Sequence, residues 1–460
     1  MKHRILGACL GAACIASLSA CGSLPARTGD TTVAAVPRAS SPLPPAPAWL
    51  GGVDRQYATA LRVPGLETRV FAPDRWWDVT MPLLTDARGF QVREIGRSAE
   101  QRPLRAVRWG EGGTPVLLWS QMHGDESTAT MALADLFRFL GEHPDDPLVR
   151  RLHANTTLHF LPLMNPDGAQ RFQRRNAQGI DINRDARALA SPEAQTLKRL
   201  YDQVRPAYSF NLHDQQAGYR AGDSARGTAI ALLAPPHGPS REVNPMRRRA
   251  VEVAVAIRAA LEPALSGHIA RWDDTFNPRA FGDLTAQWGS STVLIEAGAI
   301  EGDREKQQLR RHYFLALLAG LDSIASDSHA GLDIGHYFAL PENGRVWSDL
   351  VIRGGTIVSP VGPSLRADLR VDFKDALNER GGRIEDVGDL GEMRARREID
   401  ARGLFIHPLA CPPGDDEEAP LQPLVPDAPA CLQLSRDASG RDVVWKMLRD
   451  VDPAQPQPAR

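Results

Sequence analysis

The residues best suited to chemistry in this chain are a histidine and a glutamate three positions apart, His123 and Glu126. They follow a short apolar run, residues 116–119, and a stretch of helical periodicity begins a few residues later at Met131. A neutral imidazole and a carboxylate at such a junction can converge on one side of a turn, where both are suitable zinc ligands. A single pair of this kind is weak evidence, so the rest of the chain must decide.

Two more ionisable residues come at or just after apolar runs. His213 follows residues 210–212 and is the natural third ligand, although a hydrogen-bonded histidine at a strand end would look the same. Glu296 follows the apolar run 293–295. A glutamate there is costly unless it is hydrogen-bonded, paired or beside a metal.

Polar segments lie between these candidates, at residues 165–168, 174–176 and 179–184. In the plainest interpretation they form a turn and a solvated basic loop. Beside a metal site, the neighbouring Asn183 and Arg184 would instead favour carboxylate binding, because a guanidinium offers a two-pronged donor.

The elements that must position these residues alternate between strands and helices. Strands are expected at 90–95, 104–109, 116–119, 157–163, 208–212, 228–233 and 292–295, and helices at 192–204, 247–265 and 304–325. This alternation predicts an α/β fold, with a mostly parallel sheet covered by helices on both faces. Ligand sites in such sheets lie at the carboxyl ends of the strands, where His123, His213 and Glu296 all fall.

Five motifs occur in the order that is typical of one enzyme family. They are HGDE at 123–126, NPDG at 165–168, RRN with GIDINR at 174–184, NLH at 211–213 and IEAG at 295–298. Across roughly residues 114–298 the chain therefore resembles the zinc carboxypeptidases of the carboxypeptidase A type, the funnelins. The resemblance implies a mixed, mostly parallel eight-stranded sheet flanked by helices, and one Zn²⁺ per chain.

The resemblance also implies a role for each matched residue. His123, Glu126 and His213 correspond to the zinc ligands, which leaves a fourth position for water. Glu296 corresponds to the general base, and Arg174 to the arginine that polarises the scissile carbonyl, with Arg175 as a near alternative.

The GIDINR motif supplies three more expected roles. Asp181 corresponds to the carboxylate that orients the first histidine ligand, and Asn183 and Arg184 to the pair that binds the terminal carboxylate of the substrate.

Two departures from the family pattern bear on the substrate. The mobile tyrosine of the family has no counterpart, since residues 273–288 contain no tyrosine, and Arg279 is the candidate replacement. Asp185 and Asp214 stand where neutral polar residues are commoner. Extra negative charge at these positions is expected to disfavour acidic C-termini.

The N-terminus has the features of a lipoprotein. Residues 1–20 combine a basic start with a short apolar segment and end before Cys21, as in a bacterial lipobox. An ordinary signal peptide is the alternative. Gly22 after the cysteine favours the outer over the inner membrane, and residues 21–48 are a Pro-, Ala- and Ser-rich tether. We therefore expect a protein of the bacterial cell envelope, lipid-anchored on the periplasmic side.

Three further segments complete the expected organisation. Residues 49–328 form the catalytic domain, 329–410 a small β domain and 411–460 a Pro-rich tail. The β domain resembles the one that flanks the barrel of amidohydrolases, but no barrel follows it. Cys411 and Cys431 form a disulfide or remain as two free thiols, with the sequence favouring neither.

The charge balance and the motifs together define the predicted function. With 54 basic and 56 acidic side chains, the composition gives no support for nucleic-acid binding. We predict a zinc metallocarboxypeptidase that hydrolyses C-terminal amide bonds of peptides by attack of an activated water. The alternatives are a peptidase or amidase acting on murein stem peptides, an N-deacylase of small acylated amino acids, and a binding lipoprotein without activity.

Overall fold

The computed structural model describes residues 37–344, 346–411 and 419–447. The predicted signal peptide, Cys21 and the first part of the tether lie outside the described residues. Within the described part of the chain, none of the helices is both long enough and apolar enough to cross a bilayer.

The first sheet has eight strands in the order β1-β2-β4-β3-β5-β8-β6-β7. The strands are β1 Phe90–Arg97, β2 Pro103–Trp109, β3 Thr114–Ser120, β4 Thr156–Leu161, β5 Tyr208–Asp214, β6 Ile230–Leu233, β7 Ile269–Arg271 and β8 Ser291–Ala297. Strands β4, β3, β5 and β8 are parallel neighbours, whereas β1, β2 and the β8–β6 pair are antiparallel. The predicted mixed, mostly parallel eight-stranded sheet is confirmed.

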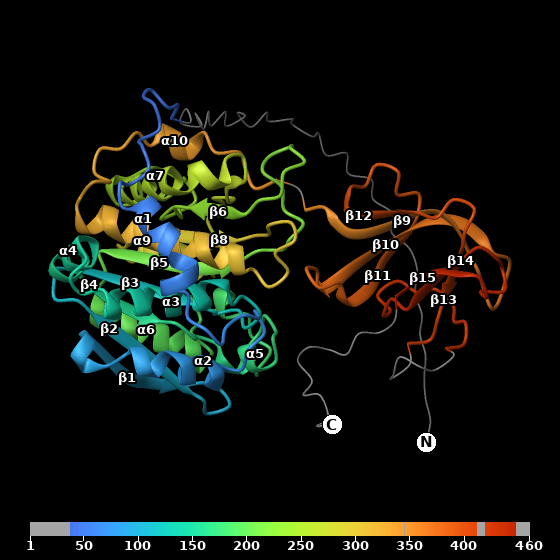
Figure 1. The fold of residues 1–460 in the computed structure, drawn as a ribbon, viewed down its shortest axis with the longest axis horizontal. Coiled ribbons are helices and arrows are strands. Elements are labelled where there is room, and N and C mark those ends of the chain that lie inside the picture. The colour runs from blue at the N-terminus through green and yellow to red at the C-terminus, as the bar shows by residue number, and fades with distance from the viewer. Residues whose placement is uncertain (1–36, 345, 412–418, 448–460) are drawn as a thin grey trace, which may run out of the picture. The chain divides into compact units, whose positions relative to one another are not determined.

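Ten α-helices and four short helical turns accompany the strands among the described residues (Figure 1). The helices are α1 Leu50–Gln56, α2 Pro73–Thr80, α3 Thr128–Glu142, α4 Pro147–Asn155, α5 Pro166–Gln170, α6 Pro192–Val204, α7 Pro245–Leu265, α8 Phe281–Gln287, α9 Gln307–Ala325 and α10 Gly335–Phe338. The short turns are η1 Tyr57–Leu61, η2 Met81–Leu83, η3 Asp86–Arg88 and η4 Ile182–Arg184.

Helices cover both faces of this sheet, and the alternation along β3 shows how. Val116 and Leu118 belong to the apolar core that includes residues of α3, α7 and α9. Leu117 and Trp119 point the other way, into a core shared with α6 and α8. Because successive side chains of a strand face opposite sides, one continuous apolar run fills both cores.

Helix boundaries follow local signals. Helix α6 begins and ends at the residues expected from the sequence. At its start, Ser191 accepts a hydrogen bond from the Ala194 backbone N–H at 3.2 Å, and Pro192 occupies the first helical position. Asn244 caps α7 in the same way, by accepting from Arg247 N at 2.8 Å.

A second sheet follows and has its own core. Its strands are β9 Ser348–Ile357, β10 Leu365–Asp375, β11 Arg380–Gly388, β12 Ala395–Asp400, β13 Phe405–Pro408, β14 Leu432–Ser435 and β15 Val443–Met447. Figure 1 draws them in orange and red. Leu350, Ile352, Val371 and Leu432 are among the side chains that fill the core of this sheet.

The second sheet extends beyond the expected boundary at residue 410. Strands β14 and β15 come from the segment that the sequence analysis assigned to a tail, and they pair with β13 and with each other. The Cys411–Cys431 disulfide joins this segment to the sheet, and Cys431 is buried immediately before β14. The short strands were hard to recognise because prolines and acidic residues surround them.

Candidate active site

The central strands bring the candidate residues to one edge of the first sheet. Strands β3, β5 and β8 are parallel neighbours, so their carboxyl ends lie together. His123 follows β3, and His213 lies near the end of β5. Glu296 of β8 pairs in register with His213, which places the two side chains on the same face of the sheet.

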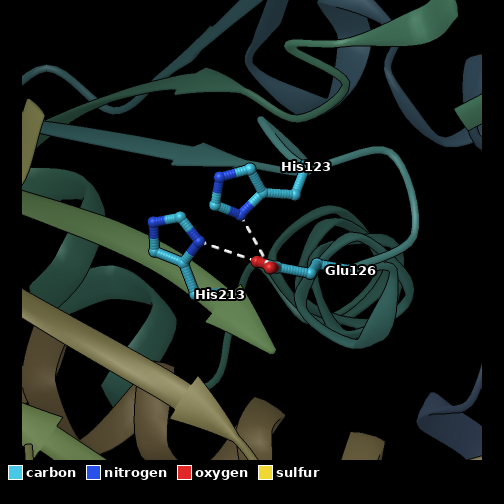
Figure 2. A group of neighbouring side chains, drawn as sticks. All are labelled: His123, Glu126 and His213. Atoms are coloured by element: carbon cyan, nitrogen blue, oxygen red, sulfur yellow. Dashed lines mark hydrogen bonds and ion pairs between the residues drawn. The ribbon is translucent and has the colours of Figure 1, made fainter. Parts of the chain in front are cut away.

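His123, Glu126 and His213 converge at this edge (Figure 2). The Nδ1 atoms of His123 and His213 lie 2.6 and 2.7 Å from the two carboxylate oxygens of Glu126. All three residues are buried, and their potential ligand atoms lie within 4.8 Å of one another. Two imidazole nitrogens and one carboxylate are the donor set of a catalytic zinc site with one open position, so these residues fit a Zn²⁺ ion.

Close backbone packing holds the turn between β3 and α3. Gly124 lies against α5, and a Cβ atom added to it would be 2.0 Å from the carbonyl carbon of Gly168. Asn165 caps α5 by accepting from Gly168 N at 2.9 Å, and its side-chain amide donates to Met122 O at 3.2 Å. The NPDG motif therefore supports the turn that carries His123 and Glu126.

Asp181 and Arg174 surround the first histidine. Asp181 Oδ1 lies 3.0 Å from His123 Nε2, so it holds the ring with Nδ1 facing Glu126, as a carboxylate behind a zinc-binding histidine does. Arg174 donates to Asp181 at 3.1 Å and to Glu126 at 3.2 Å. The His123 and Arg174 side chains hold the pKa of Asp181 well below its ordinary value, despite the opposing effect of partial burial.

The adjacent residues Arg174 and Arg175 have different surroundings. Arg174 lines the cleft, whereas Arg175 is not among the lining residues and donates to the carbonyl of Gly179 at 3.0 Å. Of the two alternatives for a carbonyl-polarising arginine, Arg174 is the one beside the ligands.

Asn183 and Arg184 lie on η4, next to the second histidine. The Asn183 amide nitrogen is 3.3 Å from His213 Nε2, and its side-chain oxygen accepts from Phe281 N at 2.9 Å. Both residues line the cleft. Arg279, the candidate replacement for the missing tyrosine, donates instead to the carbonyl of Arg184 at 3.3 Å. Trp272, Thr275 and Asn277 line the cleft in that region, and Arg279 is not among the lining residues.

Glu296 is buried among other carboxylates. Burial raises the pKa of its carboxyl group well above the ordinary value, and the charges of Glu126 and Asp214 raise it further. Its Oε2 atom is buried and has no hydrogen-bond partner among the described residues. A desolvated carboxyl group with a high pKa is a strong proton acceptor.

The two additional aspartates accept hydrogen bonds from protein donors. Asp185 is buried and accepts hydrogen bonds from Ala190 N at 2.9 Å and from Ser191 N and Oγ, each at 2.8 Å. Asp214 Oδ2 accepts from Thr128 Oγ1 at 2.6 Å and from Lys306 Nζ at 2.9 Å. Asp214 Oδ1 is buried and has no hydrogen-bond partner among the described residues, so the expected bias against acidic C-termini stays a prediction.

Several residues of the site escaped the sequence analysis. Lys306, Arg69 and Asp283 line the cleft, which encloses about 690 Å³. Lys306 follows an irregular segment and adopts a left-handed backbone conformation, with φ at 53°, immediately before α9. That unusual conformation in a buried lysine depends on tertiary contacts, and no local pattern in the sequence indicates it.

Comparison with known proteins agrees with this geometry. Residues 86–224 match the family model described as zinc carboxypeptidase, and this range includes the three proposed metal ligands. Over these residues the chain is similar to the zinc carboxypeptidases. Glu296 lies beyond the matched range, so its place in the site rests on its register with His213 and on the shared cleft.

Among curated zinc carboxypeptidase relatives, similarity is confined to part of the chain. Carboxypeptidase SOL1 of Arabidopsis thaliana is 37% identical over 102 residues, which cover 21% of each protein. Human carboxypeptidase D is 32% identical over 112 residues, covering 21% of this chain and 8% of the relative. Carboxypeptidase E of Caenorhabditis elegans is 35% identical over 115 residues, covering 20% and 24%. The chain thus spans less than a quarter of the length of these relatives.

Solved carboxypeptidase structures resemble a larger part of the chain at lower identity. A metallo-carboxypeptidase from Burkholderia cenocepacia has a TM-score of 0.46 and 20% identity, covering 57% of this chain and 71% of that one. The carboxypeptidase A of Helicoverpa armigera has a TM-score of 0.45 and 15% identity, covering 60% and 80%.

Proposed function

We propose that this chain is a zinc-dependent metallocarboxypeptidase, which hydrolyses the last amide bond of peptides that end in a free carboxylate. The observation that carries this proposal is the convergence of a His-Glu-His donor set with a buried glutamate, Glu296, whose neighbour in register is His213. Asn183 and Arg184 lie in the same cleft and supply donors for a carboxylate. A binding protein without activity would have no need of a buried, unpartnered carboxyl group at this position.

Each residue of the site has a separate role in the proposed reaction. When bound, zinc supplies Lewis-acid activation of water and of the scissile carbonyl. Glu296 takes a proton from the attacking water while the water oxygen forms a bond to the carbonyl carbon. It then gives that proton to the leaving amine as the C–N bond breaks. The products are a shortened peptide acid and a free amino acid. Arg174 donates to the oxygen on which negative charge develops, and Asp181 keeps the His123 ring oriented.

A comparison of free and amidated peptides tests the proposal. The wild-type protein is expected to cleave peptides with a free C-terminal carboxylate much faster than their amides. Arg184→Ala should mainly raise KM for the free acids, by about tenfold to a hundredfold, since a charge-assisted hydrogen bond contributes roughly 1.5–3 kcal/mol. For the amides, variant and wild type should be nearly equal.

Equal cleavage of acids and amides by the wild type would overturn the carboxypeptidase assignment. The protein would then be an endopeptidase or amidase built on the same donor set. Murein stem peptides and small N-acyl amino acids belong in the same substrate panel, because the lipobox-like N-terminus would bring the protein close to murein.

We also propose a location for this activity, the periplasmic side of the bacterial envelope. The support is the sequence of residues 1–48, in which Cys21 would carry the lipid. Cys21→Ser should release the protein from the membrane fraction or leave its signal uncleaved. Wild-type protein that fractionates as free periplasmic material would contradict the lipid anchor.

A further inference from the structure

The second sheet forms part of the wall of the catalytic cleft. Besides the residues of the first sheet, the cleft is lined by a set from β9, β10 and their flanking residues: Val346, Trp347, Asp349, Asp372, Phe373, Lys374, Ala376 and Leu377. Two junctions connect these residues to the catalytic domain.

The first junction lies beside the metal ligand Glu126. Arg69 forms an ion pair with Asp375 at the end of β10, and the two residues are only 8% and 2% exposed. The carbonyl of Arg69 accepts from Ser127 Oγ at 2.6 Å, and Ser127 directly follows Glu126. Glu305 adds a further link, because it accepts from Arg69 N at 2.9 Å and from Asn378 Nδ2 at 3.4 Å. A buried ion pair supported in this way is costly to break.

The second junction lies just beyond the end of β5. Trp347 N donates to Gly218 O at 2.8 Å, and the Arg220 guanidinium lies 4.2 Å from the centre of the Trp347 ring. A Cβ atom added to Gly218 would be 2.3 Å from Trp347 O, so the contact requires glycine. Asn343 donates to Gln215 at 2.6 Å, two residues after His213.

Between the junctions, the acidic groups of the wall are already occupied. Asp349 N donates to Asp372 at 2.9 Å, and Phe373 N donates to Asp349 at the same distance. Asp349 is also paired with Arg396, and Asp372 with Arg370. Trp347, Phe373 and Leu377 are only partly buried, so their apolar surface is what this wall offers to a ligand.

We propose that the second sheet supplies a specificity subsite, in which Trp347 and Phe373 bind a large apolar side chain just before the scissile bond. This inference rests on the proposed carboxypeptidase function. Asn183 on η4, which contacts α8, would hold the terminal carboxylate, so this end of the cleft takes the residue that is released. One of the two junctions of the second sheet lies beside Glu126, and we place the part of the peptide that precedes the scissile bond on this side.

The test uses the full mature chain and N-blocked tripeptides that differ only in their middle residue, Phe or Gly. The wild type is expected to prefer the Phe peptide in kcat/KM. In Phe373→Ala this preference should fall by about tenfold or more, mainly through a higher KM for the Phe peptide. Val361→Ala is the matched control, since Val361 is in the same β domain but is 80% exposed.

The outcomes separate the two proposals. An unchanged Phe-to-Gly ratio in Phe373→Ala, with normal activity, would overturn the subsite and leave the carboxypeptidase function standing. If the wild type cleaves neither peptide, binding of both to the zinc-loaded chain is measured by calorimetry. Loss of the binding preference in Phe373→Ala would then support the subsite although the proposed function had failed, and an unchanged preference would overturn both. Trp347→Leu provides a second variant in case Phe373→Ala does not fold.

Discussion

Glu296 and His213 occupy paired positions on parallel neighbouring strands, and this register determines which side chains share the cleft. A shift of one residue in β8 would turn Glu296 away and bring an apolar neighbour to the edge. At the residue scale, the chemistry therefore depends on buried carboxylates that differ in their partners. Glu126 is contacted by two imidazoles, whereas Glu296 Oε2 lacks a partner among the described residues.

The role of Glu296 predicts a defined kinetic effect. Because proton transfer occurs only in the reaction itself, Glu296→Gln should lower kcat by at least about 10²-fold and leave KM nearly unchanged. Zinc content, measured by atomic absorption, should match the wild type. A variant with full activity, or one that loses zinc in parallel with activity, would contradict the assignment of Glu296 as general base.

The buried carboxyl group of Asp283 should make the free energy of unfolding depend on pH. Burial raises the pKa of its carboxyl group from 3.8 to about 6. The folded state therefore binds more protons than the unfolded state between these values, and the contribution of Asp283 to the free energy of unfolding falls as pH rises from about 4 to about 6. A shift of this size corresponds to at most about 3 kcal/mol.

Asp283→Asn should remove this dependence, because the amide oxygen can still accept from Asn277 N. Urea unfolding in the presence of a chelator should show the variant to be more stable than the wild type at pH 7.5 and similar to it near pH 4. A variant that is destabilised equally at both pH values would show that the ionisation of Asp283 has no part in stability.

At the scale of elements, the ends of β5 and β8 must be held together for His213 and Glu296 to share one cleft. Lys306 connects both ends, with its Nζ 2.9 Å from Asp214 Oδ2 and 3.4 Å from the carbonyl oxygen of Ala297. Each of these residues directly follows a proposed active-site residue. The lysine reaches them from the left-handed turn before α9, so three elements meet at one buried ammonium group.

Lys306→Met should therefore weaken the site without removing any of its proposed ligands. The neutral side chain leaves Asp214 as a buried carboxylate with fewer donors, and we expect kcat to fall about tenfold and zinc to be lost at lower chelator concentration. Lys306→Arg should restore part of both. Lys198→Met is the control, since Lys198 pairs with Asp202 on the exposed side of α6, where ion pairs contribute little. Unchanged zinc affinity and kcat in Lys306→Met would show that the strand ends do not depend on this contact.

At the scale of the whole molecule, the described residues contain two sheets with separate apolar cores. The first sheet is packed between α3, α7 and α9 on one face and α6 and α8 on the other, and the second sheet has its own core around Leu350 and Val371. The Cys411–Cys431 disulfide belongs to the second sheet, whereas the proposed zinc ligands belong to the first.

Separate cores predict two unfolding transitions that respond to different treatments. Removal of zinc with a chelator should lower the midpoint of one transition, because a ligand stabilises only the unit that binds it. Replacing both Cys411 and Cys431 by serine should lower the midpoint of the other transition. The loss of a disulfide that closes a loop of this length lowers the free energy of unfolding by about 2–4 kcal/mol. Calorimetry of the full chain distinguishes the two, and a single transition shifted by both treatments would contradict independent unfolding.

The local patterns of the sequence were sufficient for the parts of this protein that depend on neighbouring residues. Apolar runs located seven of the eight strands of the first sheet, all but β7, together with helices α6, α7 and α9. The sequence also placed His123, His213 and Glu296 at strand ends, and those ends meet at one edge of a parallel sheet. Contacts between residues that lie far apart in the chain could be found only in the tertiary structure. Asp214 was a free charge in the sequence and is paired with Lys306 in the fold, 92 positions away. Trp347 and Phe373 of the second β domain line the cleft, and a buried ion pair between Arg69 and Asp375, 306 positions apart, connects that domain to the first. Side-chain types and periodicity are visible along the chain, but a contact over such a separation leaves no pattern in one sequence.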